Sequence, residues 1–167
     1  MKMKKIILGI TIGLLLISCS SSESNSSNSS SNFMWRCKIN GVLYQWTYNS
    51  NEEDGCLSIG ETIRMKSPDQ SIIIYPSFNN ISTGTFNFSS SLNNNLCDIS
   101  FENKNYSTGF QGVSMIFNIS SISPTTPTPI TSQNPFKIVG TFYGTAKSLQ
   151  GAILTITDGS FVALKID

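Results

Sequence analysis

The chain of 167 residues contains four cysteines and no histidine, and this combination limits the chemistry that it can perform. Histidine is the commonest general base in enzymes and the commonest metal ligand in proteins. Without it, a Ser-His-Asp or Cys-His catalytic unit cannot form within the chain, and histidine-based zinc or iron sites are excluded. The residues with the most chemical potential are therefore the cysteines, Cys19, Cys37, Cys56 and Cys97.

Cys19 follows directly after an apolar run. Three lysines lie within the first five residues, and residues 6–17 are then apolar or small apart from one threonine. A helix of that length spans about 18 Å, whereas a bilayer core is about 30 Å thick. The run is too short to cross a membrane, but its basic start, apolar middle and small final residue are typical of a signal peptide. We predict a signal peptide over residues 1–18, cleaved between Ser18 and Cys19.

The four residues Leu16-Ile17-Ser18-Cys19 resemble a bacterial lipobox. The resemblance implies that Cys19 receives a diacylglyceryl group on its sulfur and becomes the acylated first residue of the mature protein. Two or three acyl chains hold a protein firmly at a membrane, whereas one gives only marginal binding. We therefore expect a lipoprotein anchored in the cell envelope, with the outer membrane as the expected location and either face left open. The alternative is an ordinary secretory signal with an incidental cysteine.

Residues 19–32 are expected to form a tether. Residues 20–32 consist of nine serines, three asparagines and one glutamate, so they cannot bury apolar surface and are expected to be disordered. The folded domain is predicted to span residues 33–167. From Cys19 onward the chain carries eight basic and ten acidic residues, and without a basic stripe we expect no nucleic-acid partner.

The folded part begins with a predicted hairpin. Apolar residues alternate with polar ones from Phe33 to Ile39 and from Val42 to Tyr48, on either side of Asn40-Gly41. Asn-Gly is the strongest short hairpin signal, and a two-residue loop there pairs Trp35 with Trp46. A slip by one residue would move every apolar side chain to the other face, so the register is well specified.

Further alternating or apolar segments predict about nine short strands, and no segment has a helical period of sufficient length. Asp158-Gly159 is predicted to form the last hairpin turn, between strands at 152–157 and 160–166. Residues 121–135 contain four prolines and are predicted to form a long exposed loop. These features favour an all-β antiparallel β-sandwich, with a small lipocalin-like β-barrel as the alternative.

Three short segments resemble an uncharacterised family of Bacteroidota lipoproteins. They are Ile39-Asn40-Gly41 followed by Trp46, residues 136–142, and residues 154–161. The family pairs a lipoprotein signal peptide with one β-rich domain of unknown function. The resemblance implies that arrangement here, and it brings no catalytic residues.

Two tryptophans are candidates for a ligand platform. Trp35 and Trp46 offer aromatic faces on which a sugar ring can stack. They also share the parity of Ile39 and Val42, which is the expected core face. Packing in the core is therefore the competing interpretation.

Lipidation of Cys19 leaves three cysteines in a compartment that permits disulfides. Cys37 and Cys97 both share a parity with apolar neighbours, whereas Cys56 lies at the end of a loop on the polar parity. Three pairings are possible, and we favour either a Cys37–Cys97 disulfide or three reduced thiols. No basic partner for a nucleophilic cysteine is recognisable nearby.

The acidic segment 49–55 is rich in oxygen ligands but lacks the glycine and glutamate positions of an EF-hand loop, so no metal or other cofactor is predicted.

The sequence favours a non-enzymatic binding or structural module that is attached to a membrane through its lipid and has a protein or glycan partner. The alternative is a small-ligand carrier with an apolar, barrel-like pocket.

Overall fold

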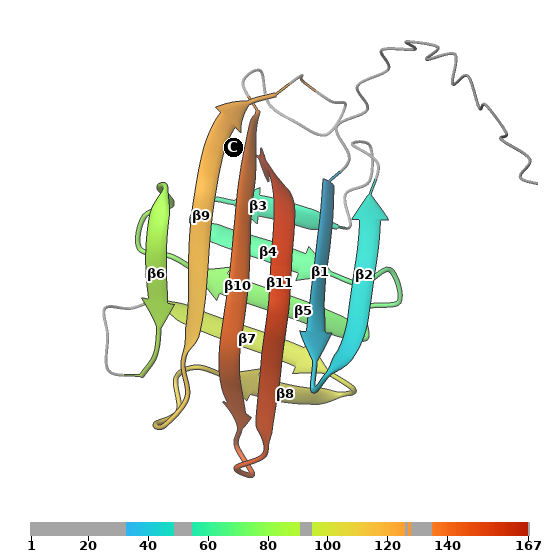
Figure 1. The fold of residues 1–167 in the computed structure, drawn as a ribbon, viewed down its shortest axis with the longest axis vertical. Helices are drawn as coiled ribbons and strands as arrows, with labels where there is room; N and C mark the ends of the chain where they lie inside the picture. Colours follow the sequence, from blue (N-terminus) through green and yellow to red (C-terminus); the bar gives the residue numbers. More distant parts are fainter. Residues whose placement is uncertain (1–32, 49–54, 91–94, 126, 128–134, 167) are drawn as a thin grey trace, which may run out of the picture.

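The computed structural model describes residues 33–48, 55–90, 95–125, 127 and 135–166. All regular elements in these ranges are β-strands, which confirms the all-β prediction (Figure 1). There are eleven strands instead of about nine: β1 (Phe33–Ile39), β2 (Val42–Tyr48), β3 (Cys56–Ile59), β4 (Thr62–Lys66), β5 (Ile72–Ser77), β6 (Gly84–Phe88), β7 (Leu96–Phe101), β8 (Lys104–Ser107), β9 (Met115–Pro124), β10 (Phe136–Ser148) and β11 (Ile153–Ile166).

The strands belong to one mixed, largely antiparallel sheet in the order β2-β1-β11-β3-β4-β5-β7-β8-β10-β9-β6. An additional pairing between β10 and β11 closes part of this order into a partial ring. The pairing of β11 with β3 is parallel, so the expectation of a purely antiparallel sheet was wrong. Parallel pairing is available to these strands because they are far apart in the chain and need no tight turn between them.

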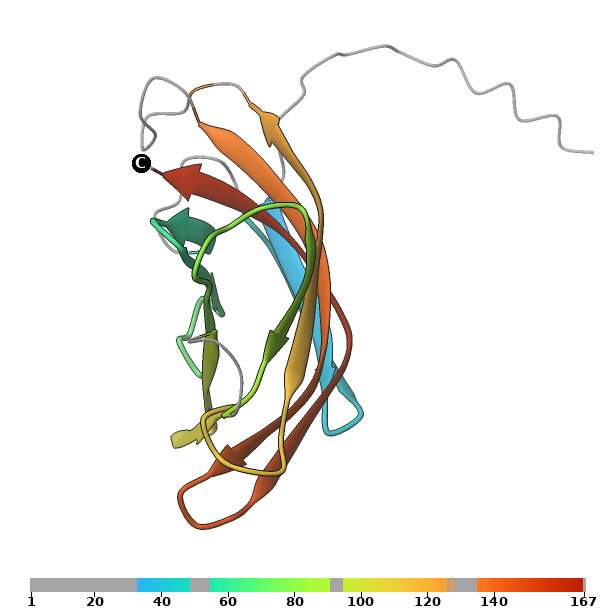
Figure 2. The same ribbon diagram turned by 90° about the vertical axis from the view of Figure 1, so that its left-hand side faces the viewer.

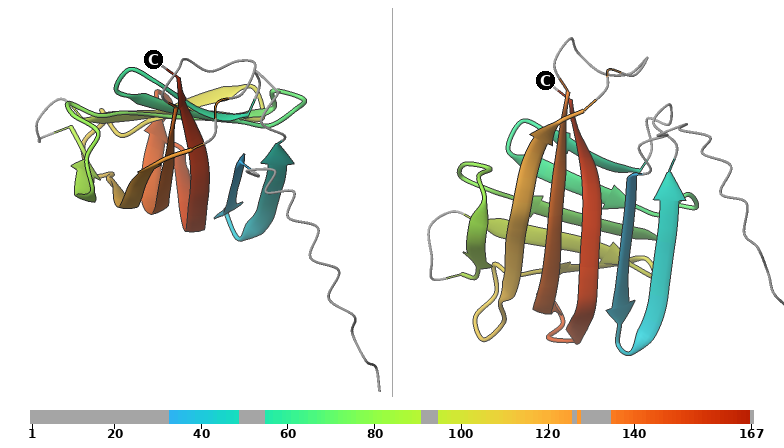
Figure 3. Two further views of the ribbon diagram at one scale, coloured as in Figure 1. Left: turned by 90° about the horizontal axis from the view of Figure 1, so that it is seen from above. Right: turned by 45° about the horizontal axis from the view of Figure 1, so that its top comes forward.

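The ribbon forms two layers that face each other (Figure 2). Strands β1, β2, β6, β9, β10 and β11 make one layer, which we call the long-strand layer because it contains the three longest strands. Strands β3, β4, β5, β7 and β8 cross behind it (Figure 3). Side chains from both layers fill the space between them. The largest fully buried ones include Trp35, Phe88, Phe117, Phe142 and Phe161.

The β1–β2 hairpin has the predicted register. Trp35 pairs with Trp46, and the pairing runs without interruption from Phe33–Tyr48 to Ile39–Val42. Asn40 and Gly41 have φ angles of 49° and 85°, as a two-residue type I′ turn requires. Val42 was expected on the core face but is 57% exposed, because the tip of the hairpin projects beyond the core.

Asp158-Gly159 is not a hairpin turn. Strand β11 continues through it, and the register shifts by one residue against both neighbouring strands. Asp158 has a φ of 54°, so its backbone is left-handed at this point. One extra residue on one strand with a left-handed backbone is a β-bulge.

The bulge explains the apolar pattern of β11. Leu154 and Ile156 are buried before it, and Phe161 and Ala163 are buried after it. In a regular strand these even and odd positions would face opposite sides. The extra residue reverses the parity, so both sets face the core.

Two other sequence expectations were incomplete. Strand β8 was missed because it is short and polar, and its two-residue turn, Glu102-Asn103, lacks the usual glycine although both residues have positive φ. Strand β9 extends to Pro124, which pairs with Phe136, so the expected loop begins later than residue 121.

Several sequence predictions lie outside the described residues. They concern the signal peptide and tether, including Ser18 and Cys19, the acidic segment 49–54 and most of residues 125–135.

Candidate functional site

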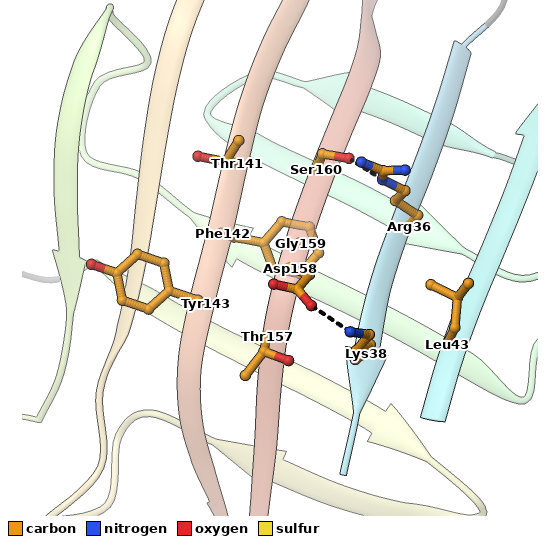
Figure 4. Close-up of a pocket in the computed structure, with 10 residues that line it drawn as sticks. All are labelled: Arg36, Lys38, Leu43, Thr141, Phe142, Tyr143, Thr157, Asp158, Gly159 and Ser160. Carbon is orange, nitrogen blue, oxygen red and sulfur yellow. Dashed lines mark hydrogen bonds and ion pairs between the residues drawn. The ribbon is translucent and has the colours of Figure 1, made fainter. Parts of the chain in front are cut away.

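A hollow of about 750 Å³ lies on the outer face of the long-strand layer, over β1, β2, β10 and β11 (Figure 4). We call it the polar hollow. It is lined by Arg36, Lys38, Leu43, Thr141, Phe142, Tyr143, Thr157, Asp158, Gly159 and Ser160. Its size is within the range of small-molecule sites, and it faces solvent rather than the core.

The bulge in β11 forms the floor of the hollow. Gly159 lies opposite Phe142, and a Cβ atom at Gly159 would lie 2.3 Å from the Phe142 carbonyl oxygen. No side chain fits there, so the two backbones approach closely only because residue 159 is glycine. A bulge bends its strand and redirects side chains, and here it brings Thr157, Asp158 and Ser160 to one surface.

The charged residues of the hollow are arranged in pairs across β1 and β11. Lys38 Nζ lies 2.8 Å from Asp158 Oδ2, and Arg36 Nε donates a hydrogen bond of 3.1 Å to Ser160 Oγ (Figure 4). The Lys38 and Asp158 side chains are 45% and 65% exposed, so their ion pair contributes about 0–1 kcal/mol to stability. Such a pair is easily rearranged by a ligand. Arg36 uses one of its five N–H donors on Ser160 and keeps others for a ligand.

Tyr143 and Leu43 lie on opposite sides of the charged groups. Tyr143 is 53% exposed, and its ring extends from β10 toward β9, away from the ion pair (Figure 4). Thr141 and Thr157 add hydroxyl groups between them. The hollow therefore combines an aromatic face, hydroxyl groups, two cations and one carboxylate.

The groups of the hollow can bind a ligand through charge-assisted hydrogen bonds, hydroxyl contacts and ring stacking. A nucleophile that is activated by histidine cannot form, because the chain has no histidine. Within the described residues, no group of three or more cysteine, aspartate, glutamate or histidine side chains is placed to hold a metal ion. The same part of the chain has no helix that is long and apolar enough to cross a membrane.

The three cysteines of the domain are all buried free thiols. Burial raises the pKa of Cys37 to about 12, and it also raises the pKa values of Cys56 and Cys97, the latter with a smaller contribution from Asp98. At neutral pH they stay protonated and are poor nucleophiles. Cys56 was expected on the polar side of a strand, but Cys56, Leu57 and Ser58 are all buried. The Cys37–Cys97 disulfide stays a prediction.

The two tryptophans occupy different environments. Trp35 is fully buried, and its Nε1 donates a hydrogen bond of 3.1 Å to the Lys66 carbonyl oxygen. Trp46 is half-buried against it, with 4.6 Å between the ring centroids. Trp35 therefore has no exposed face for a ligand and packs in the core, as the competing interpretation held.

The chain matches no protein-family model, no curated protein and no solved structure. These comparisons therefore give no indication of its function. None of the residues of the polar hollow was predicted from the sequence to bind a ligand. The apolar pattern around Asp158-Gly159 gives no signal for the bulge, because Ile156 and Phe161 share a face both across a two-residue hairpin turn and across a one-residue bulge.

A second hollow of about 510 Å³ lies over β5, β7 and β8, on the outer face of the other layer. Its lining includes Tyr75, Asp98, Tyr106, Phe110 and Leu149. Its described lining carries one carboxylate and no cation. The polar hollow has the richer set of charged and hydroxyl groups and is the stronger candidate.

Proposed function

We propose that this protein is a lipid-anchored cell-envelope lipoprotein whose domain is a non-enzymatic binding module, and that the polar hollow is its binding face. The observation that carries this proposal is the bulge at Asp158-Gly159. It brings the polar side chains of β11 beside those of β1 and β10, so that two cations, three hydroxyl groups and an exposed aromatic ring surround one hollow. The basic N-terminus and the residues Leu16-Ile17-Ser18-Cys19 support the lipid anchor, which we place in the outer membrane. The segments 39–41, 136–142 and 154–161 support membership of the Bacteroidota lipoprotein family as part of the same proposal.

The filled interior supports the binding module over the small-ligand carrier. A carrier needs an apolar cavity with an open mouth. Here the aromatic side chains of Phe88, Phe117 and Phe142 pack against one another between the layers, with centroids 4.8 and 5.3 Å apart. For the same reason we classify the fold as a two-layer β-sandwich with crossed strands rather than a lipocalin-like barrel.

The ligand class follows from the groups in the hollow. Arg36 and Lys38 outnumber Asp158, so an anionic group is favoured. The threonine and serine hydroxyls match the hydroxyl groups of a sugar, and Tyr143 offers a stacking face. We therefore infer an acidic glycan as the ligand.

Binding is tested with polygalacturonate as the acidic glycan probe, by calorimetry on the purified protein. The double variant Arg36→Gln/Lys38→Gln is expected to bind at least about tenfold more weakly, because charge-assisted hydrogen bonds contribute about 1.5–3 kcal/mol each. The variant Lys104→Gln/Lys137→Gln removes the same charge outside the hollow and is expected to bind like the native chain. Equal losses in both variants would show only nonspecific charge attraction and would reject the site.

The anchor is tested separately by feeding cells a tagged fatty acid. The native chain is expected to carry the label and to sediment with the outer membrane, whereas Cys19→Ala is expected to lose both properties. Label on the Cys19→Ala chain, or none on the native chain, would overturn the lipoprotein proposal.

A further inference from the structure

Strand β2 is an open edge of the sheet. It stands at one end of the strand order and, within the part of the chain that the structure describes, pairs with β1 alone (Figure 1). In a hairpin with a two-residue loop, the pair that closes the loop is hydrogen-bonded, and such pairs then alternate along the ladder. The backbone groups of Val42, Tyr44, Trp46 and Tyr48 therefore face β1. Those of Leu43, Gln45 and Thr47 face outward.

The edge lacks the features by which proteins usually prevent strand addition, which are charged residues, proline, bulges and short length. Residues 42–48 include no charged residue, no proline and no glycine. The register of β2 against β1 is continuous over seven pairs, so no bulge interrupts it. Strand β6, at the other end of the order, has only five residues and begins at Gly84, whose φ is 136°.

The side chains beside this edge are also incompletely covered. Val42 and Leu43 are 57% and 58% exposed, and Tyr44 and Trp46 are half-buried although they pack against the core. A further strand along β2 would cover Val42, Tyr44 and Trp46 on the inner face of the sheet and Leu43 on the outer face. It would also satisfy the open backbone groups.

We propose that this edge pairs with the β2 strand of a second copy of the chain, antiparallel and centred on Gln45. Antiparallel pairing keeps each side chain on its own face of the sheet only if opposite residues have the same parity. Among such registers, the one that places Gln45 opposite Gln45 overlaps all seven residues. Shifting the centre to Tyr44 or Trp46 leaves two residues of each strand unpaired.

The centred register is self-complementary. It places Tyr44 opposite Trp46 of the second copy and Val42 opposite Tyr48, which are aromatic and β-branched pairs of the kind that stabilise sheets. No like charges meet, because β2 has none. The outward backbone groups of Leu43, Gln45 and Thr47 meet their counterparts and form about six hydrogen bonds. This match with its own sequence favours a second copy over an unrelated strand.

Cross-linking of single-cysteine variants in intact cells tests the pairing in the full-length chain. In the dimer, two copies of residue 45 lie opposite each other with Cα atoms about 5.5 Å apart. Two copies of residue 47 lie about 14 Å apart, because four residues at about 3.4 Å separate them along the strand. With the shortest bis-methanethiosulfonate reagent, we expect Gln45→Cys to give a covalent dimer in at least about fivefold higher yield than Thr47→Cys. The native chain is the background control, since its domain thiols are buried.

Two further arms complete the test. Co-expressed Leu43→Cys and Thr47→Cys chains are expected to cross-link to each other, because these positions are opposite in the dimer, and to stop doing so when both also carry Gln45→Lys. Equal yields for Gln45→Cys and Thr47→Cys would show random collision and overturn the proposal. A Gln45→Cys product with a protein of another mass would show strand addition by a different partner and would also overturn it. Glycan binding at the polar hollow is measured independently, so either proposal can fail alone.

Discussion

At the scale of single residues, the cysteines of this domain are structural. Cys37, Cys56 and Cys97 are each buried among apolar side chains, and their thiols are protonated at neutral pH. A buried thiol packs as a small apolar group, and its reactivity is suppressed because the thiolate would be poorly solvated. This argues against a nucleophilic role for these three thiols.

Alkylation with iodoacetamide measures this protection directly. At pH 8 we expect no labelling of the three thiols in the folded protein and complete labelling in urea without reductant, with each site assigned by mass spectrometry. If Cys37 and Cys97 become labelled in urea only after reduction, the disulfide between them forms in solution.

The raised thiol pKa values also predict an alkaline loss of stability. The pKa of Cys37 rises from 9.0 to about 12 on folding, so above pH 9 the unfolded chain releases a proton that the folded chain retains. The contribution of Cys37 to the free energy of unfolding is fully present below pH 9. It falls by about 1.4 kcal/mol per pH unit as the pH rises toward 12. Urea unfolding at several pH values is expected to show a steeper fall for the native chain than for Cys37→Ala. An equal fall of stability with pH in the two chains would contradict the raised pKa of Cys37.

The two tryptophans are expected to differ in their contribution to stability. Trp35→Ala removes a fully buried ring and is expected to cost about 3–5 kcal/mol of unfolding free energy. Trp46→Ala removes a half-buried ring and is expected to cost clearly less. Urea denaturation followed by far-UV circular dichroism measures both. Equal costs would mean that Trp46 is as deeply packed in solution as Trp35.

At the scale of elements, the bulge in β11 is the feature on which both core and site depend. It turns Leu154 and Ile156 toward the same side as Phe161 and Ala163, and it brings Asp158 within reach of Lys38. A regular strand would place half of these apolar residues in solvent. The bulge is therefore needed for the fold, and the polar hollow is formed by the same bend.

Glycine at position 159 is expected to be essential for this bend. A Cβ atom there would lie 2.3 Å from the Phe142 carbonyl oxygen and 2.7 Å from the Phe142 ring. We expect Gly159→Ala to reduce the free energy of unfolding by more than about 3 kcal/mol, measured by urea denaturation. Gly151→Ala is the matched control, since its φ of 86° is strained for alanine but nothing lies within 4 Å. It is expected to cost only about 1–2 kcal/mol, and similar costs at the two positions would show that the close approach relaxes freely.

At the scale of the whole molecule, the two layers share one core. Pairings of β11 with β3 and of β10 with β8 connect the layers, and buried side chains from both form a single cluster. Neither layer has a separate apolar interior, so neither is expected to remain folded without the other.

Thermal unfolding is therefore expected to be a single transition. Tryptophan fluorescence reports on β1 and β2, and far-UV circular dichroism reports on all strands. The two midpoints are expected to coincide, as they do in two-state unfolding. A lower midpoint for fluorescence would show that the β1–β2 hairpin detaches before the rest of the domain.

The sequence alone determined the local features whose residues have one favourable geometry. The Asn40-Gly41 turn and the Trp35–Trp46 register follow from backbone preferences and alternation over a few residues, and both have the predicted form. The all-β class follows in the same way from repeated alternation with period two. The absence of histidine likewise limits the available chemistry through composition alone, whatever the fold.

Only the tertiary structure decided whether Asp158-Gly159 is a turn or a bulge, because both conformations suit these two residues. Strand β1 pairs with β11 on one side and strand β10 on the other, and together they hold β11 extended through this point. The parallel pairing of β11 with β3 and the grouping of Arg36, Lys38, Tyr143 and Asp158 depend on contacts between distant parts of the chain. Local preferences do not encode such contacts, since they arise when separate strands bury their apolar faces against one another.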